Sequence, residues 1–389
     1  VRGILASADV KSTASVLRSL GVAVPELSGE IEVAGVGADG LRAPDDALDC
    51  GNSGTSTRLL AGVVAGAGLT ATFVGDQSLS RRPMRRVKEP LEAMGAQVEL
   101  PPHGGLPMQV RGGHLTDIDW KSNTSSAQVK SCILLAALCA GVEATVREPS
   151  RSRDHTERML AAMGAEVWTN EDAVLLFGNQ TLSPLDLTVP GDPSSAAFFA
   201  ALAALAPRGD LRIERVGVNE TRTGFLAALL EMGASVELEN RVRESGEWVA
   251  DLRIRGGAAL DGVNIGAEAI PTLIDELPLV ACIAAYADGE TTVTGAAELR
   301  VKESDRISAV VDNLRALGAD AEELPDGFVV RGTRPRLRGL VTTQGDHRLA
   351  MAFGILAALP GNEIAIDDRD CVAVSYPSFW ADLARVTSA

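Results

Sequence analysis

Five carboxyl side chains are candidates for proton transfer because each lies beside a basic or a second acidic residue: Asp275, Glu276, Glu303, Asp305 and Asp346. Two carboxyl groups held among cations can serve as the general base and the general acid of one reaction. Asp275 and Glu276 also begin an otherwise apolar segment, where helix capping is the simpler explanation. Glu303 could form a surface ion pair with Lys302 or Arg306. The residues alone leave both interpretations open.

Basic side chains gather at recurring places along the chain, where they could meet an anionic ligand. Arg58, Lys130 and Arg348 lie inside or at the start of apolar segments. Arg82 precedes Pro83, so we expect an extended backbone there, which suits a side chain that reaches into a cleft. Three connecting segments are rich in Arg and Lys: SRRPMRRVK (80–88), SRSRDH (150–155) and RVKESDR (300–306). Solvated helix faces are the simpler explanation for a subset of these cations, namely Arg85, Arg86, Lys88, Arg151 and Arg158.

The composition excludes several classes of function. The chain has 389 residues, with 36 basic and 52 acidic side chains and a net charge of −16. General binding to nucleic acids or to anionic membranes is therefore not expected. Aromatic residues make up only 4% of the chain, which disfavours base-stacking surfaces. None of the four His residues shows a metal-ligand spacing, so we expect no metal site.

Cysteine usage and hydropathy indicate a cytoplasmic protein. The five cysteines are odd in number and lack C-x-x-C spacing: Cys50, Cys132, Cys139, Cys282 and Cys371. The longest apolar stretches, such as CILLAALCAGV (132–142), are well short of the roughly 20 residues of a membrane-spanning helix. The first residue is Val, which suggests a processed or truncated start.

One phrase recurs along the chain and predicts the elements that position these side chains. It reads LRSLGVAV at 17–24, LEAMGAQVEL at 91–100, LAAMGAEVWT at 160–169, LLEMGASVEL at 229–238 and LRALGADAEEL at 314–324. Each copy predicts the last turn of an amphipathic helix, a Gly in the left-handed cap position, and then a strand. We call these helices the B helices, and 377–386 is expected to form a sixth.

A second phrase alternates with the first and predicts buried helices, which we call the A helices. Each copy starts with small polar or charged residues and continues apolar on nearly every face, as a core helix does. The copies lie at 52–68, 125–141, 193–209, 275–289 and 346–361. Because helix N-termini attract anions, their polar starts are candidate phosphate or carboxylate sites, with ordinary capping as the alternative.

The two phrases together predict an α/β protein built from six α+β repeats. Each repeat reads strand, A helix, strand, B helix and a strand pair. Six B helices but only five A helices are visible, so the first repeat lacks its opening strand and helix. The Pro-Gly break at 190–191 divides the repeats three and three. We therefore expect two domains, 1–190 and 191–389.

Two nucleotide-binding motifs can be set aside. GVGADG (35–40) matches G-x-G-x-x-G, but Pro44 follows where the dinucleotide-binding motif requires the first turns of a helix. We interpret this segment as a loop. No G-x-x-x-x-G-K-S/T motif occurs, so a P-loop NTPase is not supported either.

Seven motifs follow one another over essentially the whole chain: GNSGTSTRLL (51–60), RRPM (81–84), SSAQVKS (125–131), PGDPSSA (190–196), RVKESDRI (300–307), GDHRLAMA (345–352) and SYPSF (375–379). In this order they closely resemble the 5-enolpyruvylshikimate-3-phosphate synthase family. The resemblance implies a two-domain enolpyruvyl transferase fold with three βαβαββ units per domain and buried parallel helices, as the repeat count also predicts.

The resemblance also implies a reaction and its substrates. A transferase of this family moves the enolpyruvyl group of phosphoenolpyruvate to the 5-hydroxyl of shikimate-3-phosphate and releases phosphate, in the route to aromatic amino acids. It implies no metal and no organic cofactor, a cytoplasmic monomer, and no nucleic-acid or membrane partner. Gly54 stands where glyphosate-tolerant relatives carry Ala, so sensitivity to glyphosate is implied too.

The resemblance assigns roles to single residues. Asp275 is implied as the general base for the 5-hydroxyl, and Glu303 as the proton carrier at the methylene carbon. Phosphoenolpyruvate is expected to contact Gly54, Arg82, Gln128, Arg306 and Arg348. Shikimate-3-phosphate is expected to contact Ser126, Ala127, Gln128, Asp275 and Lys302. Bidentate Arg side chains suit carboxylate and phosphate oxygens.

Two alternatives depart from this assignment. The sister enzyme acts on UDP-N-acetylglucosamine and uses a loop Cys shortly before its Arg-Pro pair, but residues 73–83 contain no Cys. The other alternative is an inactive, N-terminally truncated form. The family's opening Lys-Ser pair, with an Arg nearby, has no counterpart in this sequence.

Overall fold

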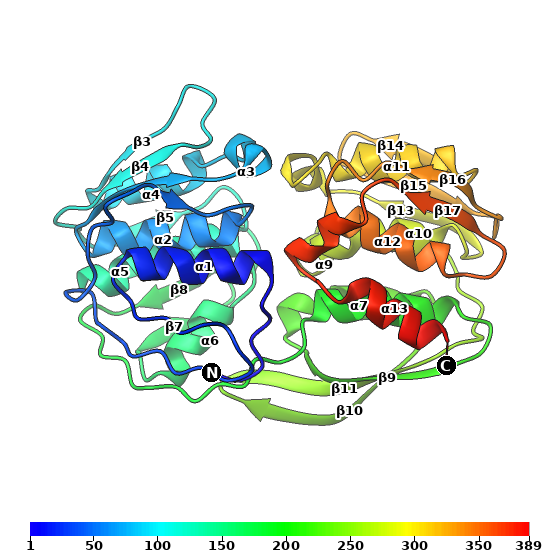
Figure 1. The fold of residues 1–389 in the computed structure, drawn as a ribbon, viewed down its shortest axis with the longest axis horizontal. Coiled ribbons are helices and arrows are strands. Elements are labelled where there is room, and N and C mark those ends of the chain that lie inside the picture. Colours follow the sequence, from blue (N-terminus) through cyan, green and yellow to red (C-terminus); the bar gives the residue numbers. More distant parts are fainter. Residues whose placement is uncertain (389) are drawn as a thin grey trace. The chain divides into compact units, whose positions relative to one another are not determined.

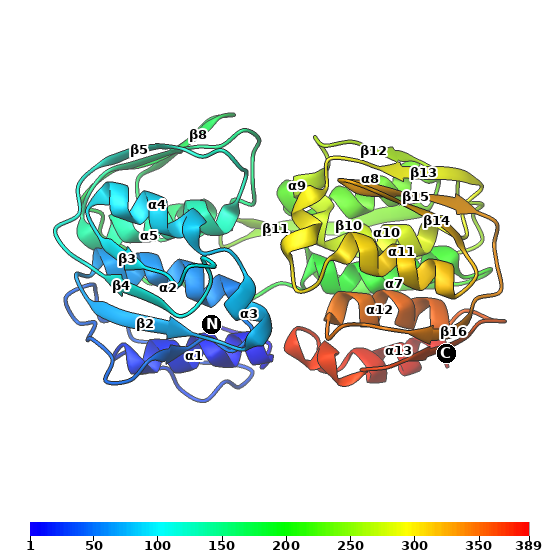
Figure 2. The same ribbon diagram turned by 90° about the horizontal axis from the view of Figure 1, so that it is seen from above.

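The computed structural model describes residues 1–388, which divide into two compact units. Unit 1 is Val1–Val189, and unit 2 begins at Pro190. Each unit has its own hydrophobic core. Within each unit the helices run side by side on the inside and small sheets lie outside them (Figures 1 and 2). Both units are therefore α/β in class.

Three four-stranded sheets share one order and one pattern of pairing. The first strand of each pairs in parallel with the second, and the fourth pairs antiparallel with both the second and the third. In chain order the strands are β1 (Leu48–Asp49), β2 (Thr70–Val74), β3 (Gln97–Glu99) and β4 (Met108–Arg111); β5 (Ile118–Lys121), β6 (Ala144–Arg147), β7 (Val167–Thr169) and β8 (Ala173–Leu176); and β12 (Asn264–Ile265), β13 (Gly289–Val293), β14 (Asp320–Leu324) and β15 (Gly327–Gly332). The predicted βαβαββ unit is confirmed.

Two further repeats are present in part. The sheet of β9 (Asp210–Gly217), β10 (Ser235–Glu244) and β11 (Glu247–Arg255) has the order β10-β11-β9, and a single parallel bridge from Gly191 to Val216 stands where the first strand would pair. The last repeat contributes the parallel pair β16 (Arg338–Val341) and β17 (Glu363–Ile366).

The five predicted A helices are all present and largely buried. They are α2 (Gly54–Gly66), α5 (Ala127–Ala140), α7 (Pro193–Leu205), α10 (Leu277–Ala284) and α12 (His347–Ala357). Their apolar sequences leave no polar face for solvent, so burial is the only stable placement. α10 is shorter than predicted at both ends, because residues 274–276 form a 3-10 turn, η2 (Ile274–Glu276), and the helix already ends at Ala284, where a turn follows.

The six predicted B helices are present as well. They are α1 (Ala8–Ser19), α4 (Arg85–Met94), α6 (His155–Ala162), α8 (Gly224–Glu231), α11 (Arg306–Ala316) and α13 (Phe379–Thr387). The glycines that follow the first five of them all have positive φ angles: Gly21 (92°), Gly95 (113°), Gly164 (90°), Gly233 (92°) and Gly318 (97°). A left-handed residue ends each helix and turns the chain away, as predicted.

Short elements connect these helices and strands. They are α3 (Gln77–Arg81), α9 (Ile270–Leu273), and the 3-10 turns η1 (Glu220–Arg222), η3 (Ala297–Val301) and η4 (Asp370–Val374). The GVGADG segment forms turns and no helix follows it, so the loop interpretation is confirmed.

The strand predicted after Gly21 is wrong. Residues 22–24 form no strand, and the chain stays irregular up to β1. The physical reason lies in Pro25, which has no N–H to donate and fixes its φ, so the segment cannot continue into a ladder.

Helices α2 and α5 of unit 1 approach each other through glycines. A Cβ atom added to Gly62 would lie 2.1 Å from the carbonyl oxygen of Cys132, and one added to Gly66 would lie 2.2 Å from that of Ala136. Only glycine permits this separation, so the backbones of α2 and α5 are locked together.

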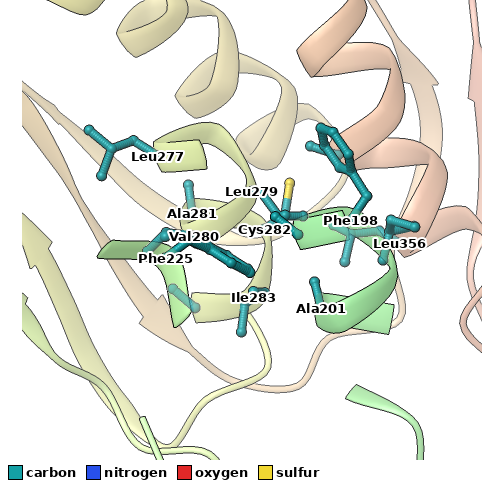
Figure 3. Packing of buried hydrophobic residues seen from close by; sticks show 14 of the residues in the cluster. Phe198, Ala201, Phe225, Leu277, Leu279, Val280, Ala281, Cys282, Ile283 and Leu356 are labelled. Atoms are coloured by element: carbon teal, nitrogen blue, oxygen red, sulfur yellow. The ribbon is translucent and has the colours of Figure 1, made fainter. Parts of the chain in front are cut away.

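The core of unit 2 is organised around α10. Figure 3 shows Val280 and Ile283 of α10 among Phe198 of α7, Phe225 of α8 and Leu356 of α12. Because these side chains are buried on every side, the polar start of each A helix stays in a fixed position. None of the helices within residues 1–388 is long and apolar enough to cross a membrane.

Candidate active site

The predicted site residues fall into two clusters, one in each unit, and each cluster is described by itself. The cluster of unit 1 consists of Gly54, Arg82, Ser126, Ala127 and Gln128. The cluster of unit 2 consists of Asp275, Lys302, Glu303, Arg306 and Arg348. In both, the side chains come from the starts of A helices and from the segments before B helices.

The start of α2 brings two arginines to one glycine. A Cβ atom added to Gly54 would lie 3.3 Å from Nη1 of Arg58 and 3.3 Å from Nη1 of Arg82. Arg82 follows α3 with an extended backbone (φ −71°, ψ 141°), as its position before Pro83 predicts. Its Nη2 donates to Oδ1 of Asn52 at 2.7 Å. The absent side chain of Gly54 therefore leaves room beside two guanidinium groups.

Gln128 joins this group from the first turn of α5. Its Oε1 accepts a hydrogen bond from Nη1 of Arg58, and its Nε2 donates to the hydroxyl of Thr55 at 2.8 Å. Gly54, Arg82 and Gln128 are thus brought together, and Arg58 connects them. A planar anion such as a carboxylate could be bound by donors in this arrangement.

Ser126 and Ala127 form the start of α5. Ser126 is the N-cap residue, but its side chain makes no capping bond. Its amide donates instead to Oε1 of Glu148 at 2.7 Å. Ala127 is the first helical residue and can offer only backbone donors. This helix start is a place where a phosphate could be bound.

In unit 2, one buried arginine connects three carboxylates. Arg306 has only 1% of its side chain exposed. Its Nε donates to Oδ2 of Asp346 at 2.8 Å, its Nη2 to Oε2 of Glu303 at 2.6 Å, and its Nη1 to Oδ1 of Asp275 at 3.3 Å. Burial alone would lower the pKa of Arg306, but the charges of these carboxylates raise it. The guanidinium therefore stays charged.

Asp275 lies among three cations. Nζ of Lys302 is 3.5 Å from its Oδ1, and Nη2 of Arg348 is 3.9 Å from its Oδ2. Arg306 is the third cation, at 3.3 Å. Glu276 is the N-cap residue of the helix that follows, and its side chain makes no capping bond. The capping alternative is therefore wrong for Glu276.

Asp346 fixes the start of α12. It accepts a hydrogen bond from the amide of Arg348 at 2.9 Å and from the hydroxyl of Ser304 at 3.0 Å. Burial alone would raise the pKa of Asp346, but the charge of Arg306 holds it below its usual range. The next residue, His347, is buried, and its pKa is lowered by that burial to about 4.

One candidate of the sequence analysis that received no role, and several side chains that were not predicted, also belong to these clusters. The candidate is Glu276, which is buried and accepts hydrogen bonds from Nη1 of Arg348 at 3.1 Å and from the hydroxyl of Ser194. Arg222 donates to the same hydroxyl at 2.7 Å and to Oδ1 of Asp192 at 3.0 Å. Arg222 lies just before the B helix α8, as Arg82 lies just before α4 and Arg306 begins α11, and this equivalence was the signal that could have found it.

Other predicted cations have a different place. Lys130 is buried behind the start of α5, where Glu148 and Glu157 neutralise it. Arg85 and Arg151 are exposed, as expected of solvated helix faces. Among the described residues, no group of three or more His, Cys, Asp or Glu side chains could hold a metal ion.

The unit 2 cluster has the composition that acid–base chemistry on an anion requires. Asp275 and Glu303 lie on opposite branches of the Arg306 guanidinium, and Lys302 and Arg348 add two donors. One carboxylate can accept a proton while the other delivers one, and the cations can hold a carboxylate or a phosphate.

Comparison with known proteins was made on this basis. Residues 1–383 match the family model described as EPSP synthase (3-phosphoshikimate 1-carboxyvinyltransferase). A protein of Sulfurihydrogenibium sp. (strain YO3AOP1) named 3-phosphoshikimate 1-carboxyvinyltransferase is 48% identical, over 100% of this chain and 91% of its own length. The counterpart from Aquifex aeolicus (strain VF5) is 46% identical, over 99% of this chain and 90% of its own.

A solved structure gives the same result. An EPSP synthase from Acinetobacter baumannii matches with a TM-score of 0.85 and 40% identity, over 99% of this chain and 89% of that chain. An enolpyruvyl transferase from Streptomyces tendae matches with a TM-score of 0.75 but 18% identity, and so supports the fold alone. The predicted two-domain enolpyruvyl transferase fold is confirmed.

Proposed function

The chain belongs to the EPSP synthase family, and from this premise we propose that it transfers the enolpyruvyl group of phosphoenolpyruvate to the 5-hydroxyl of shikimate-3-phosphate. The observation that carries the proposal is a group of five side chains at the starts of α10, α11 and α12 that ion pairs hold together: Asp275, Lys302, Glu303, Arg306 and Arg348. An enzyme with two anionic substrates and no cofactor needs such a group.

The proposed reaction divides the two proton transfers between two carboxyl groups. Asp275 takes the proton of the 5-hydroxyl while the hydroxyl oxygen forms a bond to C2 of phosphoenolpyruvate, and Glu303 delivers a proton to C3. In the second step C3 returns its proton to Glu303, and the bond from C2 to the phosphate oxygen breaks. Phosphate leaves with the proton that Asp275 took from the hydroxyl, the enol ether remains, and both carboxyl groups return to their starting states, so atoms and charges balance.

The cations have distinct proposed roles. Arg306 and Arg348 hold phosphoenolpyruvate, and Lys302 holds shikimate-3-phosphate beside Asp275. The fixed position of Arg306 supports this role, because its bonds to Asp346 leave it no freedom to turn away. Preorganised cations stabilise the charge that develops on a leaving phosphate.

Unit 1 supplies the remaining contacts of the proposal. Arg82 and Gln128, with space left by Gly54, contact phosphoenolpyruvate. Ser126, Ala127 and Gln128 contact shikimate-3-phosphate from the start of α5. The 3.3 Å separations from an added Cβ of Gly54 to both arginines support this assignment, since a side chain at this position would crowd two groups that can donate to an anion.

We also propose that the protein acts as a monomer in the cytoplasm. Its proposed substrates are small and its cysteines show no disulfide pattern, as in reducing compartments. Light scattering on the purified protein would give its mass, and a dimer mass would contradict the monomer.

Phosphate release tests the proposed function. The purified protein should release phosphate from phosphoenolpyruvate only when shikimate-3-phosphate is present, and Asp275→Asn and Glu303→Gln should each lower turnover at least about hundredfold. Release driven equally well by UDP-N-acetylglucosamine would favour the sister reaction. No release with either acceptor would favour an inactive protein.

A further inference from the structure

A buried lysine in unit 1 has no role in the proposed reaction. Lys130 lies in the first turns of α5 with 2% of its side chain exposed. Its Nζ is 3.1 Å from Oε2 of Glu148 and 2.8 Å from Oε1 of Glu157. Buried ion pairs contribute little net stability, because removing charges from water costs as much as their attraction returns. The ion pairs of Lys130 therefore need an explanation other than stability, and the place of Glu148 beside the start of α5 offers one.

The two oxygens of Glu148 do different things. Oε2 faces Lys130 and accepts a hydrogen bond from the hydroxyl of Ser152 at 2.7 Å. Oε1 accepts the amide hydrogen of Ser126 at 2.7 Å. Ser126 is the N-cap residue of α5, and Glu148 accepts its amide hydrogen from another segment, as the side chain of the third helical residue does in a capping box. The carboxylate therefore fixes the first turn of α5.

A second contact joins the same two segments. The hydroxyls of Ser125 and Ser150 are 2.8 Å apart, and the amide of Ser150 donates to the Ser125 hydroxyl at 3.0 Å. The chain before α5 is thus held to the chain after β6 at two successive residues, Ser125 and Ser126. Residues that fix a helix start in this way determine where its donors point.

The charge of Glu148 raises a second consideration. A carboxylate bonded to a helix start would repel any anion that binds there, because like charges at close range oppose each other. Lys130 compensates that charge from behind the helix. The carboxylate of Glu148 can therefore fix the start of α5, while the pair of Lys130 and Glu148 adds little net negative charge there.

We propose that Glu148 is a positioning residue for shikimate-3-phosphate and that Lys130 is its counter-ion. Glu148 orients the Ser126–Gln128 turn toward the substrate, and Lys130 removes the repulsion that its carboxylate would exert. This inference rests on the proposed function, since it takes Ser126, Ala127 and Gln128 as contacts of that substrate.

Glu157 provides the matched control. It pairs with the same lysine, and its side chain is 4% exposed against 8% for Glu148, but the amide of Ser126 donates to Glu148 and not to Glu157. If the cluster served only folding, substitutions of Glu148 and Glu157 would have similar consequences. If Glu148 positions the helix start, only its substitution affects substrate binding.

The experiment compares Glu148→Ala, Glu148→Gln, Lys130→Met, Lys130→Arg and Glu157→Gln. We expect Glu148→Ala to raise KM for shikimate-3-phosphate roughly tenfold, with KM for phosphoenolpyruvate changed less than about threefold, as for the loss of one charge-assisted hydrogen bond. Glu148→Gln keeps an acceptor for Ser126 and should have a smaller effect. Lys130→Arg should retain most of the affinity that Lys130→Met loses.

The outcomes separate the inference from the proposed function. Glu157→Gln should leave both KM values unchanged even where it alters the free energy of unfolding. Equal rises in both KM values for Glu148→Ala and Glu157→Gln would overturn the positioning role. If Glu148→Ala does not fold, Ser152→Ala removes one bond to Oε2 and should raise KM for shikimate-3-phosphate alone by a smaller factor. A wild-type protein that fails to bind shikimate-3-phosphate in calorimetry would instead overturn the proposed function.

Discussion

Each unit buries one cation beside the start of an A helix, and the two cations differ in what surrounds them. Lys130 of unit 1 meets two carboxylates whose side chains are 8% and 4% exposed. Arg306 of unit 2 meets Asp346, which is fully buried, and also Asp275 and Glu303, whose side chains are 11% and 20% exposed. One cation is enclosed, and the other faces side chains that solvent or a ligand can reach.

The difference shows that similar repeats can have different roles. The buried cation of unit 1 supports a helix start, and that of unit 2 holds the two carboxyl groups of the proposed reaction. Lysine is a point charge on a flexible stem, and it suffices to neutralise a carboxylate from behind. Arginine is a planar fork, and three carboxylates can be held in fixed directions around it. Unit 2 therefore holds Asp275 and Glu303 in defined places, whereas Lys130 acts through Glu148.

The largest expected effect comes from removing the two cations in turn. Arg306→Met leaves Asp346 buried without its partner, so we expect a loss of about 3–5 kcal/mol in the free energy of unfolding. Turnover should also fall at least about hundredfold. Lys130→Met should cost less, because burial raises the pKa of Glu157 and that carboxyl can take up a proton instead. Urea unfolding of both variants measures this; equal losses would break the comparison.

The second prediction concerns pH in unit 2. Burial, with the charges of Arg348 and Arg306, lowers the pKa of His347 to about 4 from a usual 6.5, although Asp346 opposes the shift. A lowered pKa contributes stability that is present above pH 6.5 and is lost as the pH falls toward 4. The contribution is roughly 3 kcal/mol.

His347→Gln provides the measurement for this residue. The wild-type protein should lose free energy of unfolding relative to His347→Gln between about pH 6.5 and 4. Parallel curves for the two proteins in urea unfolding would show that His347 is not held neutral.

The third prediction has the opposite sign and belongs to unit 1. The pKa of Glu157 is raised from its usual 4.5 by burial, even though Lys130 acts against the shift. A raised pKa contributes stability below pH 4.5 that is lost as the pH rises through the folded-state value. Relative to Glu157→Gln, the wild-type protein should therefore weaken with rising pH, by less than the His347 effect. A difference that grows with pH would contradict the account of unit 1.

The smallest effect on stability is expected at Gly54. An added Cβ would meet the ends of the Arg58 and Arg82 side chains at 3.3 Å and Leu79 at 3.7 Å, and no backbone atom as closely, so Gly54→Ala should change the free energy of unfolding by less than about 0.5 kcal/mol. Its KM for phosphoenolpyruvate should rise a few-fold, because the room beside two guanidinium groups shrinks. Glyphosate should inhibit the wild-type protein more strongly than this variant. Inhibition that is equal in both would refute a role for Gly54 in ligand access.

The repeats were predictable because the residues that define each helix end are adjacent in the sequence. A Gly after a Leu-rich turn predicts a helix end, and the five such glycines do end their helices. The extended Arg82 follows from Pro83 in the same way. The strand expected after Gly21 shows the limit of the repeat pattern. The phrase at 17–24 resembles its other copies, but Pro25, which directly follows it, lacks the N–H that strand pairing requires.

The pairing of side chains was not predictable from local patterns. Arg58 bonds to Gln128, 70 positions away, and Arg348 bonds to Glu276, 72 positions away. Such pairs depend on the packing of whole helices. Asp275 and Glu276 appeared to be caps for the same reason, because their true partners are distant in the sequence.

The glycine contact between α2 and α5 affects the candidate site as well as the packing of the two helices. Gly54, Arg58, Gly62 and Gly66 recur every four residues and so share one face of α2. The end of this face near Gly54 carries the arginine that bonds to Gln128, and the other end touches backbone atoms of α5. In a library of random variants, substitutions at positions 62 and 66 should therefore lower activity, although these positions lie roughly two and three helical turns from Gly54. The atom nearest to an added Cβ at each of them is a backbone oxygen of α5.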